Sequence, residues 1–449
     1  MNPGIIIIGA GPGGYETAVR AARLGLEIVV IEKDKLGGTC LNAGCIPTKC
    51  LCHSADTLEV LKERGIQPDA EELAKAVAHK DETVEKLRSG VAMLMKTPGI
   101  TLVEGGAQFV DAHTVKVMKE GSEQVFSAPN IIIATGSTTK FLPIEGAHAR
   151  GVLTSTEILN LTSLPQRLCI IGGGVIGIEF ASIFRSFGVE VDVVEFMKEI
   201  LPPFDRDVAK RLRTSLKKRG INFHLGAAAK AIHEGEPMLV DFEEKGKLQQ
   251  VECDMVLMAV GRAANVEALN LSDVGITYTP RGICVDENMQ TCIPGVYAIG
   301  DINGLCQLAH AATFQGYCAL KHITNPHSSV YRDALNVIPS AVFSNPEAAM
   351  VGVTEEQLTE AGVEYRSLKS FYRANGKALS MDADDGIVKL LVSPEDKLLG
   401  AHILGAHASD MIHELALLMR MGGTVSDIAH TVHAHPSLSE IILAASEAL

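Results

Sequence analysis

The sequence predicts an α/β protein in which one strand, glycine turn and helix unit occurs twice, followed by a separate α+β domain. Three observations predict this fold. Glycine-rich turns beginning at Gly9 and Gly172 each follow a short apolar run and precede a helix-compatible stretch. Each first glycine is followed 23 residues later by an acid, Glu32 or Glu195, at the end of a second apolar run. After about residue 337 the pattern changes to short strands and turns without a glycine motif.

Length and composition bound the possible functions. The 449 residues suggest about three domains of roughly 150 residues, and 47% hydrophobic with 21% charged residues is typical of a soluble globular protein. A net charge of −14 argues against a nucleic-acid partner. No apolar run is long enough to predict a transmembrane helix. The first nine residues lack a basic leader, and ten cysteines are too sparse for a disulfide scaffold, so we expect a cytoplasmic protein.

The first unit has the pattern of a dinucleotide-binding fold. A strand at 5–8 leads into G-x-G-x-x-G at Gly9, Gly11 and Gly14, a helix at 15–24, and a strand that ends on Glu32. Glycines permit the tight turn and the close approach of a pyrophosphate, and the acid can accept hydrogen bonds from ribose hydroxyls. With the flanking strands and the acid in place, the motif is strong evidence.

The second unit repeats this pattern with a strand at 168–171, a helix at 178–187 and a strand at 191–194 that ends on Glu195. Its glycines are Gly172, Gly174 and Gly177. Two dinucleotides are therefore expected, and they need not be the same.

Further segments are predicted around these units. Strands at 131–134 and 296–299 lead into glycine turns, and Asp301 follows the second. This aspartate suits a ribityl or ribose hydroxyl, or a plain turn, and position alone does not decide between them. Residues 54–96 are expected to form long helices. The C-terminal block is expected to hold strands at 386–393 and 397–404 and a helix at 409–421.

Cys40 and Cys45 lie in a glycine-rich stretch. In an ideal helix, residues five apart have Cα atoms roughly 8.6 Å from each other, whereas a disulfide needs about 7 Å or less. The pair can bridge only if the backbone between them is unwound, which Asn42 and Gly44 tolerate. Pro47 suits the first turn of a helix, which would place Cys45 at its positive N-terminal end.

Three other interpretations of these cysteines compete. They could be ordinary buried residues, a structural disulfide, or a metal site with Cys50, Cys52 and His53. The spacing matches no usual zinc pattern, and structural disulfides are rare inside cells. A redox-active pair is favoured, provided that the chain binds an electron carrier.

Two dinucleotides could supply that carrier. Thiolates do not readily give hydride to nicotinamide, so a flavin is the natural relay. The cysteines follow closely after Glu32, which favours FAD in the first unit. In the second, Glu195 would repel a 2′-phosphate and residues 196–200 contain no arginine, which favours NAD.

The C-terminal stretch supplies His433, His435 and Glu440. A histidine with a carboxylate partner is a usual general base near neutral pH. On these residues alone, a surface His-x-His or an incidental metal site ranks above catalysis.

Taken together, the two glycine motifs, the stretch from Gly37 to Lys49, Ala-Ile-Gly-Asp at 298–301 and His-Pro-Ser-Leu-Ser-Glu at 435–440 resemble the pyridine nucleotide-disulfide oxidoreductases. The closest resemblance is to the group that oxidises dihydrolipoamide on lipoyl domains of 2-oxoacid dehydrogenase or glycine cleavage complexes. It implies a Rossmann-like FAD domain beginning at 1–140, a Rossmann-like NAD domain at 141–265, an FAD-side central region at 266–336, and a homodimer-forming interface domain at 337–449.

The resemblance also implies residue roles. Cys40 would exchange with the dithiol, and Cys45 would contact the flavin as a thiolate. His435, oriented by Glu440, would take the substrate proton in the site of the partner subunit, and Lys49 would lie near the flavin and pair with Glu179. The implied FAD residues are Gly9, Gly11, Gly14, Glu32, Lys49, Thr135, Gly136 and Asp301, and the implied NAD residues are Gly172, Gly174, Gly177, Glu195 and Gly261. No metal is implied.

Some positions depart from the family pattern. The usual Lys and Glu are missing near Ala311 and Gln315, and 261–265 is a looser form of Gly-Arg-x-Pro-Asn. A glutathione reductase, a mercuric reductase and a nonenzymatic flavoprotein redox sensor are the alternatives. Glu195 without a following arginine disfavours the first, the absence of a terminal cysteine pair disfavours the second, and the combination of cysteines with His435 and Glu440 disfavours the third.

Overall fold

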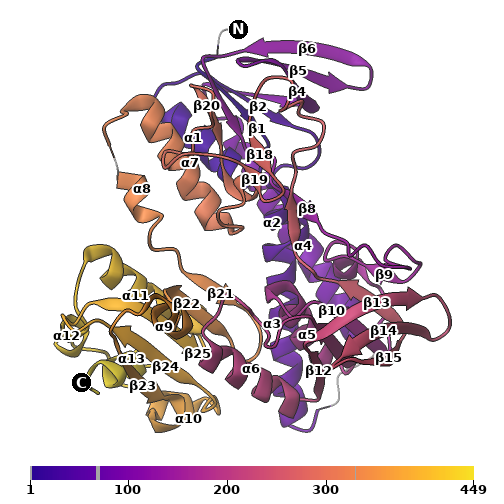
Figure 1. Cartoon of the computed structure of the whole chain (residues 1–449), viewed down its shortest axis with the longest axis vertical. Coiled ribbons are helices and arrows are strands. Elements are labelled where there is room, and N and C mark those ends of the chain that lie inside the picture. Colours follow the sequence, from indigo (N-terminus) through magenta and orange to yellow (C-terminus); the bar gives the residue numbers. More distant parts are fainter. Residues whose placement is uncertain (1–2, 67–70, 329, 449) are drawn as a thin grey trace. The chain divides into compact units, whose positions relative to one another are not determined.

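The computed structural model describes residues 3–66, 71–328 and 330–448, which form two compact units (Figure 1). Unit 1 contains Met1–Cys50, Ala78–Lys140 and Gly261–Asn336, and unit 2 contains Leu51–Val77, Phe141–Val260 and Val337–Leu449. Within the described ranges, no helix is long and apolar enough to cross a membrane. Residues 67–70 of the predicted helical stretch 54–96 lie outside the described residues.

Unit 1 is built on a parallel five-stranded sheet with the order β20-β7-β1-β2-β3. Four isoleucines make up β1, and all four are buried, as expected for a strand that is covered on both faces. The strands predicted at 131–134 and 296–299 are β7 and β20, and both join this sheet. The chain therefore returns to the sheet twice after β3. The strands are β1 (Ile5–Ile8), β2 (Ile28–Glu32), β3 (Ile100–Glu104), β7 (Asn130–Ile133) and β20 (Val296–Ala298).

Helices that lie wholly or partly in unit 1 contain or follow the glycine turn and the cysteines. α1 (Pro12–Arg23) packs against α7 (Ala309–Thr324) (Figure 1). The cysteine stretch forms α2 (Gly38–Ala43) and the start of α3 (Cys45–Glu63), and α4 (Glu72–Leu94) follows. The long helices expected over 54–96 are confirmed, although α3 begins earlier, at Cys45.

The smaller elements of unit 1 are two-stranded and three-stranded antiparallel sheets and short helices. They are β4 (Gly106–Asp111), β5 (Thr114–Lys119), β6 (Ser122–Ser127), β8 (Ser137–Thr139), β17 (Arg262–Ala264), β18 (Tyr278–Thr279), β19 (Gly282–Ile283), η2 (Gly300–Asn303) and α8 (Val330–Ala334).

The second glycine motif lies in unit 2, on a parallel sheet with the order β12-β11-β10-β16-β9. An antiparallel sheet, β13-β14-β15, follows in the chain before β16. The elements are β9 (Val152–Leu153), η1 (Ile158–Asn160), β10 (Arg167–Ile171), α5 (Val175–Ser186), β11 (Glu190–Glu195), α6 (Arg206–Lys218), β12 (Ile221–Leu225), β13 (Ala227–His233), β14 (Met238–Glu244), β15 (Lys247–Cys253) and β16 (Met255–Met258).

The C-terminal part of unit 2 is an antiparallel sheet, β21-β22-β25-β24-β23, with helices. The predicted strands at 386–393 and 397–404 and the helix at 409–421 are confirmed as β24, β25 and α11. The fold class is therefore confirmed: two Rossmann-like parts and an α+β C-terminal part. The elements are β21 (Ser340–Val342), β22 (Ala348–Gly352), α9 (Glu355–Ala361), β23 (Arg366–Phe371), η3 (Tyr372–Ala374), α10 (Gly376–Ser380), β24 (Ile387–Val392), β25 (Leu398–Leu404), α11 (Ala408–Met421), α12 (Val425–Ala429) and α13 (Glu440–Ser446).

Within unit 2, a buried charge cluster joins α6 to the C-terminal sheet. Lys389 and Asp205 are 1% and 0% exposed, and the ammonium group donates to both carboxylate oxygens of Asp205 at 2.8 Å. Glu355 accepts from the same ammonium at 2.5 Å. His402 lies opposite Lys389 in the strand register and its Nε2 contacts the carbonyl oxygen of Val353 at 3.0 Å. Removing one member would leave a buried charge without its partner.

His402 predicts a pH-dependent stability. Burial lowers its pKa to about 4, whereas an unfolded histidine has a pKa of about 6.5. The unfolded chain therefore binds the proton first, and the free energy of unfolding should fall by up to about 3 kcal/mol as the pH drops from about 6.5 to 4. We expect His402→Gln, which can still donate to Val353, to flatten this dependence in denaturant titrations. The exposed-site variant His79→Gln should keep the wild-type slope, and equal slopes for wild type and His402→Gln would contradict the assignment.

Candidate active site

The first glycine turn forms an open helix N-terminus. Gly9 has φ +106°, and a Cβ on Gly14 would lie 1.9 Å from the carbonyl oxygen of Gly9. Gly11 caps α1 without any side-chain hydrogen bond. The turn therefore needs its glycines, and the first backbone N–H groups of α1 face no capping side chain, as a pyrophosphate site requires.

The glutamate at the end of the strand after each glycine motif is held by two backbone N–H groups. Glu32 accepts from the backbone N–H groups of Ala10 at 2.7 Å and Asp34 at 2.9 Å. Glu195 accepts from Gly173 at 2.5 Å and Met197 at 2.6 Å. Each carboxylate keeps lone pairs for ribose hydroxyls.

The second glycine turn matches the first. Gly172 has φ +113°, a Cβ on Gly177 would lie 2.0 Å from the oxygen of Gly172, and Gly174 caps α5 without a side-chain hydrogen bond. Gly261, the remaining predicted NAD residue, belongs to unit 1, where its carbonyl accepts from the Lys140 N–H at 3.0 Å. Its role stays a prediction.

The backbone between the two cysteines is unwound, as a disulfide between them would require. α2 ends at Ala43, Gly44 has φ −147° and ψ −115°, and α3 begins at Cys45. A Cβ on Gly44 would lie 2.9 Å from the oxygen of Thr39 and 3.3 Å from the Cα of Cys40. The Gly44 backbone therefore packs directly against α2, and the side chain of Cys40 comes within hydrogen-bonding reach of Cys45.

Side chains around the pair hold this geometry. Asn42 donates to the carbonyl oxygens of Leu36 and Gly38, both at 2.9 Å, and the Thr48 hydroxyl donates to that of Gly44 at 2.6 Å. Neither Asn42 nor Thr48 was expected as a site residue.

The charge of the pair is unevenly distributed. The hydrogen bond to Cys45 and then burial raise the pKa of the Cys40 thiol, while the nearby Lys49 ammonium opposes the rise. Cys45 lies at the N-terminus of α3, whose partial positive charge favours a thiolate there. This direction agrees with the predicted roles, which stay predictions.

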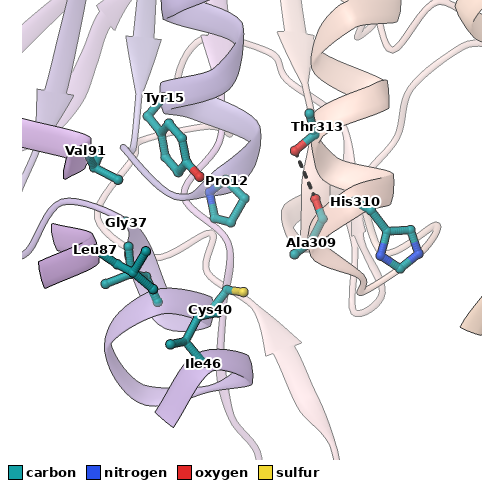
Figure 2. Close-up of a pocket in the computed structure, with 11 residues that line it drawn as sticks. Pro12, Tyr15, Gly37, Cys40, Ile46, Leu87, Val91, Ala309, His310 and Thr313 are labelled. Carbon is teal, nitrogen blue, oxygen red and sulfur yellow. Dashed lines mark hydrogen bonds between the residues drawn. The ribbon is translucent and has the colours of Figure 1, made fainter. Parts of the chain in front are cut away.

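Cys40 borders a cavity of about 280 Å³ inside unit 1 (Figure 2). Most of its lining is apolar, and it comes from α1, α2, α4, the start of α3 and the first turn of α7. Burial raises the pKa of Tyr15, one of the few polar side chains in the lining, to about 12. The lining residues are Pro12, Tyr15, Gly37, Cys40, Leu41, Ile46, Leu87, Val91, Ala309, His310 and Thr313.

Asp301 lies in η2, directly after β20, and is anchored by its side chain. Its Oδ2 accepts from the Ser137 hydroxyl at 2.5 Å, and Arg262 donates to the Ser137 hydroxyl at 2.7 Å and its carbonyl at 2.6 Å. The Thr135 hydroxyl donates to the Asn265 carbonyl, and the Gly136 carbonyl accepts from the Asn265 N–H, both at 3.0 Å. Sequence reasoning missed Ser137 and Arg262 as site residues, although Arg262 lies within the recognised Gly-Arg motif.

The two C-terminal histidines differ. His433 is enclosed, with contacts to the Thr431 carbonyl at 2.8 Å and Glu414 at 3.0 Å. The side chain of His435 is 81% exposed, and its Nδ1 contacts Glu440 at 3.0 Å. The Ser437 N–H and then His435 lower the pKa of Glu440. His435 is thus oriented through Nδ1, which leaves Nε2 for a substrate.

Glu179 is 3% exposed on α5 and accepts from the Phe343 N–H at 2.9 Å. Lys49 belongs to unit 1 and Glu179 to unit 2, so their pairing stays a prediction. Among the residues that the structure describes, no three His, Cys, Asp or Glu side chains are grouped so that they could bind a metal.

Comparisons with known proteins cover both parts of the chain. The profile "Pyridine nucleotide-disulphide oxidoreductase" matches residues 3–316, and the dimerisation domain of the same group matches residues 338–446. Dihydrolipoyl dehydrogenase of Bacillus subtilis (strain 168) is 43% identical over 451 residues, covering 98% of this chain and 95% of the relative. The same enzyme of Geobacillus stearothermophilus is 41% identical with the same coverage. A Cu(II) complex of the HOCl-induced flavoprotein disulfide reductase RclA from Escherichia coli has a TM-score of 0.90 at 30% identity, covering 100% of this chain and 99% of that one.

Proposed function

This chain belongs to the pyridine nucleotide-disulphide oxidoreductase family, and from that premise we propose that it oxidises dihydrolipoamide and passes the electrons to NAD. The proposed substrate is carried by the lipoyl domains of 2-oxoacid dehydrogenase or glycine cleavage complexes, in the cytoplasm. One observation supports it above the others: Cys40, in contact with Cys45, borders a mainly apolar pocket. Such a lining suits the short aliphatic chain of a lipoyl group better than the charged tripeptide glutathione.

The cofactors of this family are FAD and NAD. The two glycine turns, each with an uncapped helix N-terminus and a fixed carboxylate, fit two dinucleotides. We assign FAD to the turn with Glu32 and NAD to the turn with Glu195. FAD held at the first turn would supply the two-electron relay between the cysteine pair and the nicotinamide of NAD.

The cysteine pair performs the thiol chemistry in this proposal. A substrate thiolate attacks the Cys40 sulfur of a Cys40–Cys45 disulfide, the bond between the two cysteines breaks, and Cys45 leaves as a thiolate. The second substrate thiol then attacks the substrate sulfur that is bonded to Cys40. Lipoamide leaves as a disulfide, and Cys40 and Cys45 hold the two electrons.

His435 moves the protons. Its Nε2 accepts a proton from the attacking substrate thiol and returns it to the departing Cys40 sulfur, while Glu440 holds Nδ1. The dimerisation domain belongs to the C-terminal part, which carries His435. We propose that this histidine serves the cysteine pair of the partner subunit in a homodimer.

A substrate panel tests the proposed function. The purified protein should reduce NAD with dihydrolipoamide and should reduce glutathione disulfide with neither NADH nor NADPH. Faster reduction of glutathione disulfide or of mercuric ion than of lipoamide would contradict the proposed substrate. A flavoprotein that turns over none of these would favour the redox-sensor alternative.

Glu195 is expected to decide the dinucleotide. Replacing it with serine removes a carboxylate that binds two ribose hydroxyls and repels a 2′-phosphate, so the KM for NAD should rise about 10-fold or more. The preference for NAD over NADP, measured as the ratio of kcat/KM values, should fall. Glu190→Ser, at the exposed start of the same strand, is the matched control. An unchanged ratio in Glu195→Ser would remove this residue from the dinucleotide site.

A further inference from the structure

A buried side chain of α7 holds the turn that carries Asp301. Gln315 is 2% exposed, and its Oε1 accepts from the Gly300 N–H at 2.6 Å and from the Asn303 Nδ2 at 2.9 Å. These are the first and last residues of η2. One amide oxygen therefore joins both ends of the turn to α7.

The turn has little freedom to move away from this oxygen. Gly300 has φ +74°, and a Cβ there would lie 3.0 Å from the Cβ of Ala312, so α7 packs directly on the turn. Asn303 is 5% exposed and also donates to the Ala298 carbonyl at 3.0 Å. Without Gln315, the buried Gly300 N–H would lose its acceptor.

Asp301 is thus fixed from two sides. Gln315 binds the backbone N–H of the preceding residue, and Ser137, in contact with Arg262, binds the carboxylate. A carboxylate that receives a ribityl or ribose hydroxyl must be placed to within a fraction of an ångström before the ligand arrives.

We propose that Gln315 is a positioning residue for FAD, which acts through Gly300 and Asn303 to hold the Asp301 carboxylate in its binding orientation. This inference rests on the proposed function of Asp301 as an FAD-binding residue. The required feature of Gln315 is an acceptor oxygen at the end of a buried side chain of this length.

FAD affinity tests the proposal independently of turnover. The FAD dissociation constant of the full chain would be measured by flavin fluorescence, after release and rebinding of FAD, for Gln315→Met, Asp301→Ala and the double variant. We expect each single variant to bind FAD about 10-fold more weakly. Because Gln315 acts through Asp301, the double variant should bind little more weakly than Asp301→Ala alone.

Two further variants separate positioning from general stability. Gln315→Glu keeps an acceptor oxygen and should bind FAD within about 3-fold of wild type. Thr324→Val removes a hydroxyl that bonds to the Leu320 carbonyl at the far end of α7 and should leave FAD affinity unchanged. If Gln315→Met does not fold, Asn303→Ala replaces it and should weaken FAD binding in the same direction.

The outcomes distinguish the inference from the proposed function. Wild-type FAD affinity in a folded Gln315→Met, together with weak binding by Asp301→Ala, would overturn the role of Gln315 alone. Losses that multiply in the double variant would also overturn it, because the two residues would then act separately. Wild-type affinity in Asp301→Ala would show that Asp301 does not bind FAD. Gln315 could then not act on FAD through Asp301.

Discussion

The Cys45→Ser variant is expected to reduce NAD with dihydrolipoamide roughly 10⁴-fold or more slowly than the wild type, a loss typical of removing one member of a catalytic unit. A serine hydroxyl cannot form the disulfide that takes up the two electrons. Without Cys45, Cys40 has no disulfide that the substrate thiolate could attack. Steady-state NADH formation measures the effect.

Cys40→Ser should lose turnover to the same extent, and the two variants differ in absorbance. If Cys45 is the thiolate beside the flavin, Cys40→Ser keeps a long-wavelength absorbance band and Cys45→Ser lacks it. The reverse pattern would exchange the two roles. Cys284→Ser, at an exposed position outside the pocket, should keep wild-type turnover.

His435→Gln is expected to lower kcat with dihydrolipoamide by about 10² to 10⁴-fold, the usual contribution of a general base. Glutamine keeps a polar side chain of similar length but cannot take the thiol proton. The loss should be largest where the substrate thiols are mainly protonated and should diminish at higher pH, because hydroxide increases the thiolate fraction. The measurement is kcat as a function of pH.

His433→Gln is the matched control for this prediction, since His433 is enclosed by Thr431 and Glu414. It should change kcat by less than about 3-fold. Equal losses in both variants would show that the His435 effect is structural.

A mixture of inactive variants tests the shared site. Co-expression of Cys45→Ser with His435→Gln gives heterodimers in which one site combines an intact cysteine pair with an intact His435. About a quarter of wild-type turnover is expected if the two chains pair at random in a two-fold dimer. Activity near zero would show that the cysteine pair and the His435 of one active site belong to the same chain.

Much of the site could be predicted because its signals are local in sequence. The 23 residues from glycine to acid form a turn, a helix and a second strand, whose end returns to the glycine turn. Glu32 and Glu195 therefore make equivalent contacts with the residue after the first glycine. The break in the helix at Gly44 followed from comparing helix geometry with the reach of a disulfide. In both cases, backbone geometry alone limits the possible structures.

The contacts that sequence reasoning missed join distant segments. Ser137 meets Asp301 across 164 positions and Arg262 across 125, and nothing near any of them indicates the pairing. In the sequence Gln315 is only a departure from a family pattern, because the turn that it holds, η2, contacts α7 only in the folded chain. The residues of the strand at 296–299 do not by themselves indicate which sheet it joins, and only the family resemblance placed 266–336 on the FAD side.

The central claim is that the Cys40 and Cys45 pair carries electrons from the dithiol to NAD. The most direct test is anaerobic reduction with dihydrolipoamide, followed by alkylation and mass spectrometry of the peptide that contains both residues. We expect two alkyl groups on this peptide after reduction, and none when NAD is added before the alkylating reagent, because the pair is then reoxidised to a disulfide. Labelling that is the same with and without NAD would contradict the claim.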